Sequence, residues 1–386
     1  MDNKVYIVRC DSYDNAEEKM AELLRLMGGI EKFAFRDEKI VLKVNLLRGS
    51  NPDKAISTHP KVVSAVARLL NKAGNKSIVA DSPGSGYKYN TITLEKTYQK
   101  SGLADASKES GFELNMDCSY REIFFEAGKL IKRFEVITPV LQNNGVFNLC
   151  KMKTHVFMVM TGAVKNNFGV IPGLAKPGYH AKLNDTRHFA DMLLDLAEFV
   201  APRLSIMDAI VAMEGDGPGL GTPRKVGLLL GSINQLALDI VAAEIMGIKR
   251  EQNPVLLAAE KRGMAPTNIK DVDVVGEDLS QLRIRDFKLP SNICGGIGLG
   301  PMPWYQSVLK VLFKNAFSSK PVIIKDACKA CGTCVKACPV NAVAIKKQKV
   351  AAITEKECIR CYCCHEMCPE NAIQLKNSIL YKLVNS

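Results

Sequence analysis

Nine of the 13 cysteines of this chain lie between Cys328 and Cys368. Eight of them form two runs of identical spacing, over residues 328–339 and 358–369. In each run three cysteines are separated by two residues, and a fourth follows after three more and precedes a proline. The runs form an internal repeat of about 30 residues. Thiolates at this density in one segment indicate ligands of a metal centre rather than isolated packed thiols.

The spacing is typical of [4Fe–4S] ligation. Three closely spaced cysteines can wrap one cubane cluster, and the fourth, carried away by the next helical turn, ligates the other cluster. The sequence therefore predicts two [4Fe–4S] clusters with crossed ligand sets. Cluster one takes Cys328, Cys331, Cys334 and Cys368, and cluster two takes Cys338, Cys358, Cys361 and Cys364.

Other interpretations of the cysteines fit less well. Structural zinc needs only four ligands, commonly two separated Cys-x-x-Cys pairs. An odd cysteine total and a start without a secretory signal argue against a disulfide framework. Cys363 lies outside the ligand pattern, and it is either a packed thiol or a redox-active one.

Residues 322–376 resemble a bacterial-type two-cluster ferredoxin domain, which implies a small α+β fold and single-electron transfer at low potential. Residues 320–386 contain eleven Lys or Arg and five acidic residues. Because each oxidised cluster with its thiolates brings roughly −2, the loaded domain stays near about +2. Such a surface favours an acidic redox partner of the ferredoxin or flavodoxin type, unless the lysines form only a solvated face.

The densest polar segment outside the cysteines lies between residues 153 and 188. Lys153 and Lys165 could hold an anionic small molecule such as a carboxylate or phosphate. A histidine that titrates near neutral pH could supply a proton as an electron arrives, and His155 and His180 are the candidates. A single loop histidine is more often a structural hydrogen-bonding group, so that alternative stays open.

Acidic residues could complete this site. Asp208 or Glu214 could orient the histidines and lysines, or could bind a metal ion together with His155 and His180. No His-x-x-x-His spacing supports the metal alternative.

Two glycine-rich segments, at residues 81–86 and 214–221, match neither a dinucleotide fingerprint nor a P-loop. They could permit close backbone approach to a ligand or form an anion-binding nest, or they are plain turns. The candidate cofactor-binding residues are Asp81, Asn166, Asn167, Gly215 and Gly217.

Alternating strands and helices must position these segments. Short runs rich in Val, Ile and Leu predict strands at 5–9, 39–45, 77–81, 146–151, 204–210 and 225–230. Helical patterns lie at 16–27, 60–73, 186–200 and 234–247. This alternation predicts an α/β domain with a largely parallel sheet, which binds ligands beyond the carboxyl ends of its strands.

Residues 5–290 resemble the family catalogued as domain of unknown function 362. The resemblance rests on the segments 43–45, 58–60, 81–84, 153–155, 161–169 and 208–221. It implies an α/β fold and frequent fusion to a C-terminal ferredoxin domain, and it implies no reaction.

The length of 386 residues suits two or three domains. We expect an α/β domain at 1–300, an amphipathic linker helix at 301–320 and the two-cluster domain with its tail at 321–386. The linker helix would pack the two domains together or lie on a membrane surface. The net charge of +12 favours anionic partners, but no basic run interleaves with aromatics, so we expect no nucleic-acid binding. With no clean membrane span we expect a cytoplasmic protein.

Three functions fit the sequence. The first is an oxidoreductase, in which the clusters relay electrons to or from a ligand on the α/β domain. The second is a dedicated electron carrier whose α/β domain only binds partners. The third is a cluster-dependent assembly or sensor protein without turnover.

Overall fold

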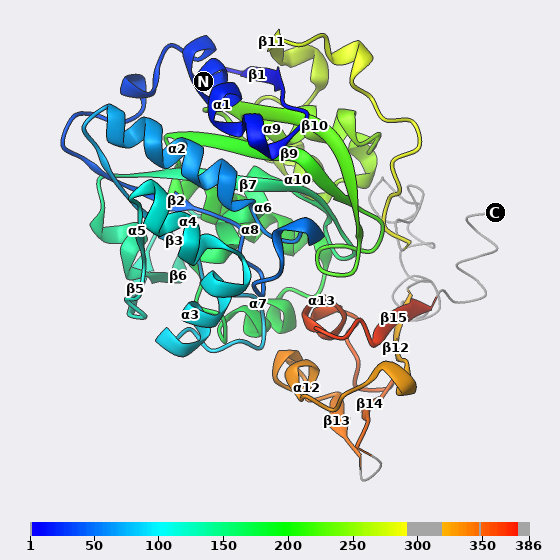
Figure 1. The fold of residues 1–386 in the computed structure, drawn as a ribbon. Helices are drawn as coiled ribbons and strands as arrows, with labels where there is room; N and C mark the ends of the chain where they lie inside the picture. Colours follow the sequence, from blue (N-terminus) through cyan, green and yellow to red (C-terminus); the bar gives the residue numbers. More distant parts are fainter. Residues whose placement is uncertain (1, 292–318, 347–348, 377–386) are drawn as a thin grey trace.

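The computed structural model describes residues 2–291, 319–346 and 349–376. A nine-stranded sheet forms the centre of the larger domain, with strand order β11-β1-β10-β9-β7-β2-β3-β4 and β8 added to β7 (Figure 1). The strands are β1 (Lys4–Arg9), β2 (Lys39–Lys43), β3 (Lys76–Ala80), β4 (Glu113–Leu114), β7 (Gly145–His155), β8 (Val159–Thr161), β9 (Leu204–Glu214), β10 (Thr222–Ser232) and β11 (Asp273–Gly276). A separate hairpin is formed by β5 (Tyr120–Phe124) and β6 (Arg133–Ile137).

Most strand pairs of the sheet are parallel. The run β9-β7-β2-β3-β4 is parallel throughout, whereas β10 pairs antiparallel with both β9 and β1. The predicted α/β fold with a largely parallel sheet is therefore confirmed. Because β7, β2 and β3 are parallel neighbours, their carboxyl ends meet at one edge of the sheet, which is where such sheets bind ligands.

Helices cover both faces of the sheet, and the strands alternate between two cores. Ile40 and Leu42 of β2 pack in one core with α1 and α2, while Val41 faces the other core, with α8, α9 and α10. The helices are α1 (Ala16–Leu26), α2 (Pro60–Lys72), α3 (Thr91–Lys100), α4 (Leu103–Ser110), α5 (Thr138–Gln142), α6 (Ala163–Asn166), α7 (Lys176–Lys182), α8 (Thr186–Val200), α9 (Gln235–Ile245) and α10 (Pro254–Lys261).

All six strands and all four helices predicted for this domain are present. The three longest described strands, β7, β9 and β10, extend beyond the predicted segments. Their polar ends stay paired with the neighbouring strands, beyond the apolar runs from which the strands were predicted. The predicted linker helix at 301–320 lies outside the described residues except at its end, where Lys320 already belongs to a strand.

The C-terminal domain is a small α+β unit, as predicted. It contains β12 (Lys320–Ile323), α12 (Thr333–Ala337), β13 (Val343–Ile345), β14 (Ala351–Ile353), α13 (Cys363–Met367) and β15 (Ile373–Lys376). The strands pair antiparallel as β12 with β15 and β13 with β14. Each half of the domain therefore contains one short helix with a strand before it and a strand after it.

Helix α13 joins the small domain to the α/β domain (Figure 1). The buried guanidinium of Arg48 donates to the carbonyl oxygens of Cys368 at 2.5 Å and Glu366 at 3.2 Å, and to Gly219 at 2.8 Å. A Cβ at Gly84 would lie 2.8 Å from the sulfur of Met367, so the glycine permits this close packing. The helix is therefore held by a buried cation as well as by apolar contact.

No helix among the described residues is both long enough and apolar enough to cross a lipid bilayer.

We predict that Arg48→Met loosens this contact by roughly 2–4 kcal/mol, because three carbonyl groups lose a charged donor in a buried place. Amide hydrogen exchange of α13 in anaerobically purified protein measures the effect. Arg36→Met, at an exposed position, is the control and leaves exchange unchanged. Equal protection of α13 in all three proteins would contradict the role assigned to Arg48.

Candidate cluster sites and an interdomain cavity

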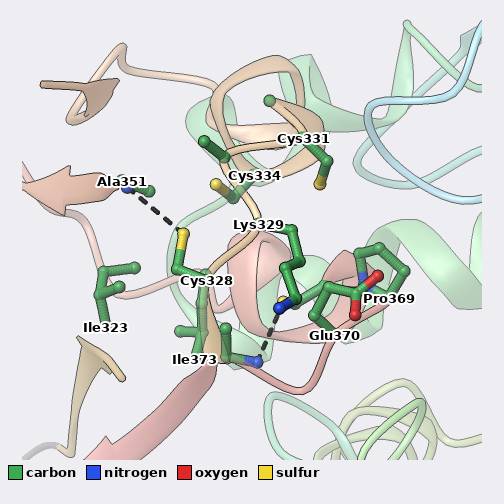
Figure 2. A pocket seen from close by; sticks show the side chains of 13 residues that line it. Ile323, Cys328, Lys329, Cys331, Cys334, Ala351, Pro369, Glu370 and Ile373 are labelled. Atoms are coloured by element: carbon green, nitrogen blue, oxygen red, sulfur yellow. Dashed lines mark hydrogen bonds between the residues drawn. The ribbon is translucent and has the colours of Figure 1, made fainter. Parts of the chain in front are cut away.

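Four cysteines from both runs surround one cavity in the small domain. Figure 2 shows Cys328, Cys331 and Cys334 around this hollow with Pro369, which follows the fourth cysteine. Cys368 completes the set. The wall is otherwise mostly apolar, with Ile323, Ala351 and Ile373 among its residues. These are the four cysteines predicted for cluster one.

A second cavity repeats this arrangement in the other half of the domain. Its lining includes Cys338, Cys358, Cys361 and Cys364 together with Tyr362 and apolar residues. The two helices bring the sets together, since α12 contains Cys334 and ends next to Cys338, while α13 contains Cys364 and ends next to Cys368. Each helix therefore carries one cysteine toward each cavity.

The donor sets fit the chemistry of [4Fe–4S] clusters. Each cavity presents four cysteine sulfurs, which is the ligand set that a cubane needs. Backbone amides already point at several sulfurs: Ala342 N–H donates to Cys338 at 3.2 Å, Ala351 to Cys328 at 3.4 Å and Ala372 to Cys368 at 3.2 Å. Such bonds stabilise the charge of a thiolate-bound cluster.

Cys363 lies on α13 between ligand candidates but lines neither cysteine cavity. It is fully buried with Ala337, Cys361 and Met367 in a small apolar cluster. The hydrogen bond with the sulfur of Cys361, followed by burial, raises the pKa of the Cys363 thiol well above its usual range. These surroundings fit a packed, protonated thiol.

We predict that Cys364→Ala loses about half of the roughly eight iron atoms expected per chain, because one cubane loses a ligand. The adjacent Cys363→Ala is the matched control and keeps the full iron content. Iron and acid-labile sulfide analysis of anaerobically purified proteins measures both. Equal iron loss in the two variants would contradict the ligand assignment.

A third cavity, which we call the interdomain cavity, lies at the carboxyl ends of β3, β2 and β7. It encloses about 60 Å³ that water-sized groups can enter. Its lining is Asn45, Leu47, Asp81, Ser82, Gly84, Ser85, Lys153, His155, Thr161, Lys165, Asn166, Phe168, Gly169, Lys176, His180, Pro218 and Glu366. Of these, Glu366 comes from α13 of the small domain.

The four residues predicted for catalysis meet in this cavity although three elements supply them. Lys153 and His155 end β7, Lys165 lies in α6 and His180 in α7. Asp81 and Asn166, predicted to contact a cofactor, also line it. Alternation along β7 explains the first pair, because residues two apart face the same side of a strand.

Lysine side chains dominate the electrostatics of the interdomain cavity. Lys153 Nζ donates to Asn45 Oδ1 and to the Ile56 carbonyl, each at 2.7 Å. Lys176 Nζ donates to the carbonyls of Ser82 at 2.8 Å and Pro83 at 2.7 Å. Burial lowers the pKa of Lys153 well below its ordinary value and that of Lys176 to about 7. An anion in the cavity would favour the protonated form of both lysines.

The two histidines are neutral in this environment. Burial and neighbouring lysines lower the pKa of His155 well below 6.5 and that of His180 to about 3. His155 Nδ1 accepts from the amides of Phe157 at 3.1 Å and Met158 at 3.3 Å, so its proton lies on Nε2. That Nε2 is 3.2 Å from Glu366 Oε1. Burial raises the pKa of Glu366 to about 7.

Other candidates lie outside the cavity lining. Asn167 points its amide nitrogen at the carbonyls of α6 and at Gln235. Gly217 lies so close to Thr154 that a Cβ would be 2.2 Å from its carbonyl oxygen, so this glycine permits strand packing. Gly215 adopts φ +77° in the turn after β9, which explains a glycine there without a ligand.

The acidic residues considered as orienting groups belong to other networks. Asp208 accepts from Lys151 Nζ at 2.8 Å, from the hydroxyl of Tyr13 at 3.1 Å and from the amide of His59 at 3.0 Å. Glu214 accepts from the amide of Lys288 at 3.1 Å. Among the described residues no group of three His, Cys, Asp or Glu is arranged to hold a single metal ion.

Sequence reasoning missed several residues of the cavity. Glu366 lies inside the second cysteine run, where the ligand spacing drew attention away from it. Thr161 begins the segment 161–169 noted in the sequence but was not named as a site residue. Lys176 begins α7, a helix that was not predicted. Lys43 lies behind the wall and pairs with Asp81 at 2.9 Å. The segment Lys43–Asn45, noted in the sequence, was the available signal for this pair.

A buried carboxylate positions the segment that carries Lys165 and Asn166. Asp239 accepts from the amides of Ala163 at 2.5 Å and Val164 at 3.1 Å, at the start of α6. A Cβ at Gly162 would lie 2.0 Å from Asp239 Oδ1, so this glycine admits the carboxylate. Burial raises the pKa of Asp239 to about 7.

We predict that the stability of the wild type, compared with Asp239→Asn, falls as the pH rises from about 5 to 8. The pKa of the Asp239 carboxyl is raised from 3.8 to about 7 in the folded protein. The stabilisation that follows from this shift is complete below about pH 3.8 and is lost as the pH rises to about 7. Thermal unfolding midpoints across this range measure the difference. Asp105→Asn, at an exposed position, gives the reference slope, and a pH-independent difference for Asp239→Asn would contradict the prediction.

Comparison with known proteins agrees with both halves of this architecture. A model of the domain of unknown function DUF362 matches residues 40–244, and a model of a 4Fe-4S dicluster domain matches residues 320–369. The chain belongs to the DUF362 family. Both resemblances inferred from the sequence are confirmed, and this DUF362 protein is an iron–sulfur protein.

Two similar proteins add detail. The thylakoid-associated protein sll1697 of Synechocystis sp. is 33% identical over 276 residues, which cover 69% of this chain and 82% of that protein. The lactate racemase apoprotein of Thermoanaerobacterium thermosaccharolyticum aligns with a TM-score of 0.41 and 10% identity, over 63% of this chain and 57% of that one.

Proposed function

We propose that this DUF362 protein is an oxidoreductase that uses two [4Fe–4S] clusters to exchange electrons with an anionic ligand in the interdomain cavity. The observation that carries the proposal is the position of Glu366. Its side chain lines the cavity, and it lies two residues from Cys364 and two from Cys368, one cysteine from each proposed ligand set. When bound, the clusters would supply single electrons at low potential.

The surrounding residues divide the remaining tasks. Lys153 and Lys165 hold the negative charge of the ligand, and Asp81 and Asn166 form part of the wall. His155 and His180 are neutral without a ligand, and a bound anion raises their pKa by supplying the missing opposite charge. Either could then hold a proton for the ligand as electrons arrive.

Electrons enter most readily from the side of the first cysteine cavity. Cys331 is exposed there, and the lysines at positions 325, 329 and 336 are exposed around it. A basic rim beside an accessible centre suits an acidic protein partner of the ferredoxin or flavodoxin type. The cytoplasmic location stays a prediction.

A cavity of this composition favours the oxidoreductase over the other two functions. A dedicated carrier or an assembly or sensor protein needs no buried group of lysines and histidines beside its centre. Because the clusters and the ligand site lie in one chain, the effective concentration of the electron donor beside the ligand stays high.

We predict that Lys165→Met lowers the midpoint potential of at least one cluster by tens of millivolts. Lys165 is a half-buried cation whose pKa is lowered by desolvation and raised by Glu366 and Cys363 of α13. Removing a nearby positive charge disfavours the reduced, more negative cluster. Redox titration followed by EPR on anaerobic protein measures the potentials.

Lys182→Met serves as control, because Lys182 ends α7 at an exposed position. It leaves the potentials unchanged. If the potentials are unchanged in Lys165→Met as well, the charge of the cavity does not affect the clusters. That result would favour the dedicated electron carrier. Zinc without sulfide in the purified protein would overturn the cluster assignment altogether.

A further inference from the structure

The interdomain cavity has an excess of positive charge that its own walls do not balance. Three lysines line it, Lys153, Lys165 and Lys176, and two carboxylates do so, Asp81 and Glu366. Asp81 is already paired with a lysine behind the wall, at 2.9 Å. One carboxylate therefore faces three lysines, an excess of two positive charges when all are ionised. Burying unpaired charge is costly, so such a cavity favours a counter-anion.

Two polar atoms of the wall that can donate a hydrogen bond have no partner in the described chain. They are Nδ1 of His180 and the hydroxyl of Thr161. Both side chains are more than nine-tenths buried. Buried polar groups are almost always satisfied, so unsatisfied ones gathered at one cavity indicate a missing ligand.

The lysines also have donors to spare. An ammonium group has three N–H bonds, and Lys153 and Lys176 each use two of them on protein oxygens. No hydrogen bond from Lys165 Nζ is seen to any described residue. The free donors come from β7, α6 and α7, so they converge on the cavity from different directions.

We propose that the interdomain cavity binds a dianionic, phosphate-type oxyanion group, either as inorganic phosphate or as the head group of a larger substrate. Two negative charges match the excess, and tetrahedral oxygens can accept from donors that converge from several sides. The planar carboxylate of a simple acid would neutralise one charge and leave a donor unmet. The inference rests on the proposed function for the role of the site, but its binding chemistry stands by itself.

The size of the cavity agrees with this class of ligand. Its 60 Å³ is several times the roughly 10–15 Å³ that a single water needs, and it suits a group of about five heavy atoms rather than a nucleotide. A larger substrate would place only its charged end here.

Isothermal titration of anaerobic, cluster-loaded protein with inorganic phosphate tests the proposal. At constant ionic strength we expect phosphate to bind at least about tenfold more tightly than acetate, since a dianion gains one more charge-assisted contact. Lys165→Met weakens phosphate binding by about tenfold or more, and Lys182→Met on α7 does not.

A second measurement covers the case in which a variant folds poorly. Titrations of the wild type above neutral pH, in two buffers of different ionisation enthalpy, count protons taken up on binding. Because Lys176 has a pKa of about 7, we expect proton uptake with phosphate, and Lys176→Met reduces it. The charged and titratable groups at this site are Lys43, Asp81, Lys153, His155, Lys165, Lys176, His180 and Glu366.

Phosphate binding no tighter than acetate, or binding that Lys165→Met leaves intact, would overturn this inference. Neither result depends on electron transfer, so the two proposals fail separately. If phosphate does not bind but Lys165→Met shifts the cluster potentials, the oxyanion proposal is wrong and the proposed oxidoreductase function stands. If phosphate binds tightly but the potentials do not shift, the oxyanion proposal stands and the oxidoreductase proposal is contradicted.

Discussion

Helix α13 has to satisfy two sites at once. Its five residues carry a cysteine of one proposed ligand set, end beside a cysteine of the other, and place Glu366 among buried lysines of the α/β domain. The helix can do so only if the small domain is held in one position, and Arg48 supplies that constraint through carbonyl groups on both domains. Electron transfer and ligand binding would thus share one rigid joint.

Buried charge is the second constraint on this protein. Lys43 and Lys151 are fully buried and each has a carboxylate partner, at 2.9 Å and 2.8 Å. Each of these pairs is balanced internally, and of their four residues only Asp81 lines the interdomain cavity. Lys153 and Lys176 of the interdomain cavity instead donate to neutral carbonyl and amide oxygens, which orient an ammonium group without cancelling its charge. The distinction between paired and unpaired lysines separates the structural cations from those available to a ligand.

Position in the fold explains why similar residues have different roles. Asp208 and Asp81 are both buried carboxylates with a lysine partner, and either could have been a site residue. Asp208 accepts from Lys151, Tyr13 and His59 away from the cavity, whereas Asp81, which also accepts from the amide of Leu46 at 2.7 Å, lines the cavity. Gly162 and Gly217 serve packing rather than ligand approach, since Gly162 admits the carboxylate of Asp239 and Gly217 admits the backbone of Thr154.

The sequence by itself determined the features that depend on local spacing. The cysteine repeat predicted both groups of four, because ligands three and four residues apart are placed by one loop and one helical turn. Apolar runs and periodicity predicted six of the nine strands of the sheet and four of the helices beside it, and the segment from Lys153 to His155 pointed to the polar site. Only the tertiary structure decided that Lys176 and Thr161 meet these residues, and that Glu366 joins them from another domain. Those contacts depend on strand order and domain packing, which join residues far apart in the chain and leave no periodic trace in it.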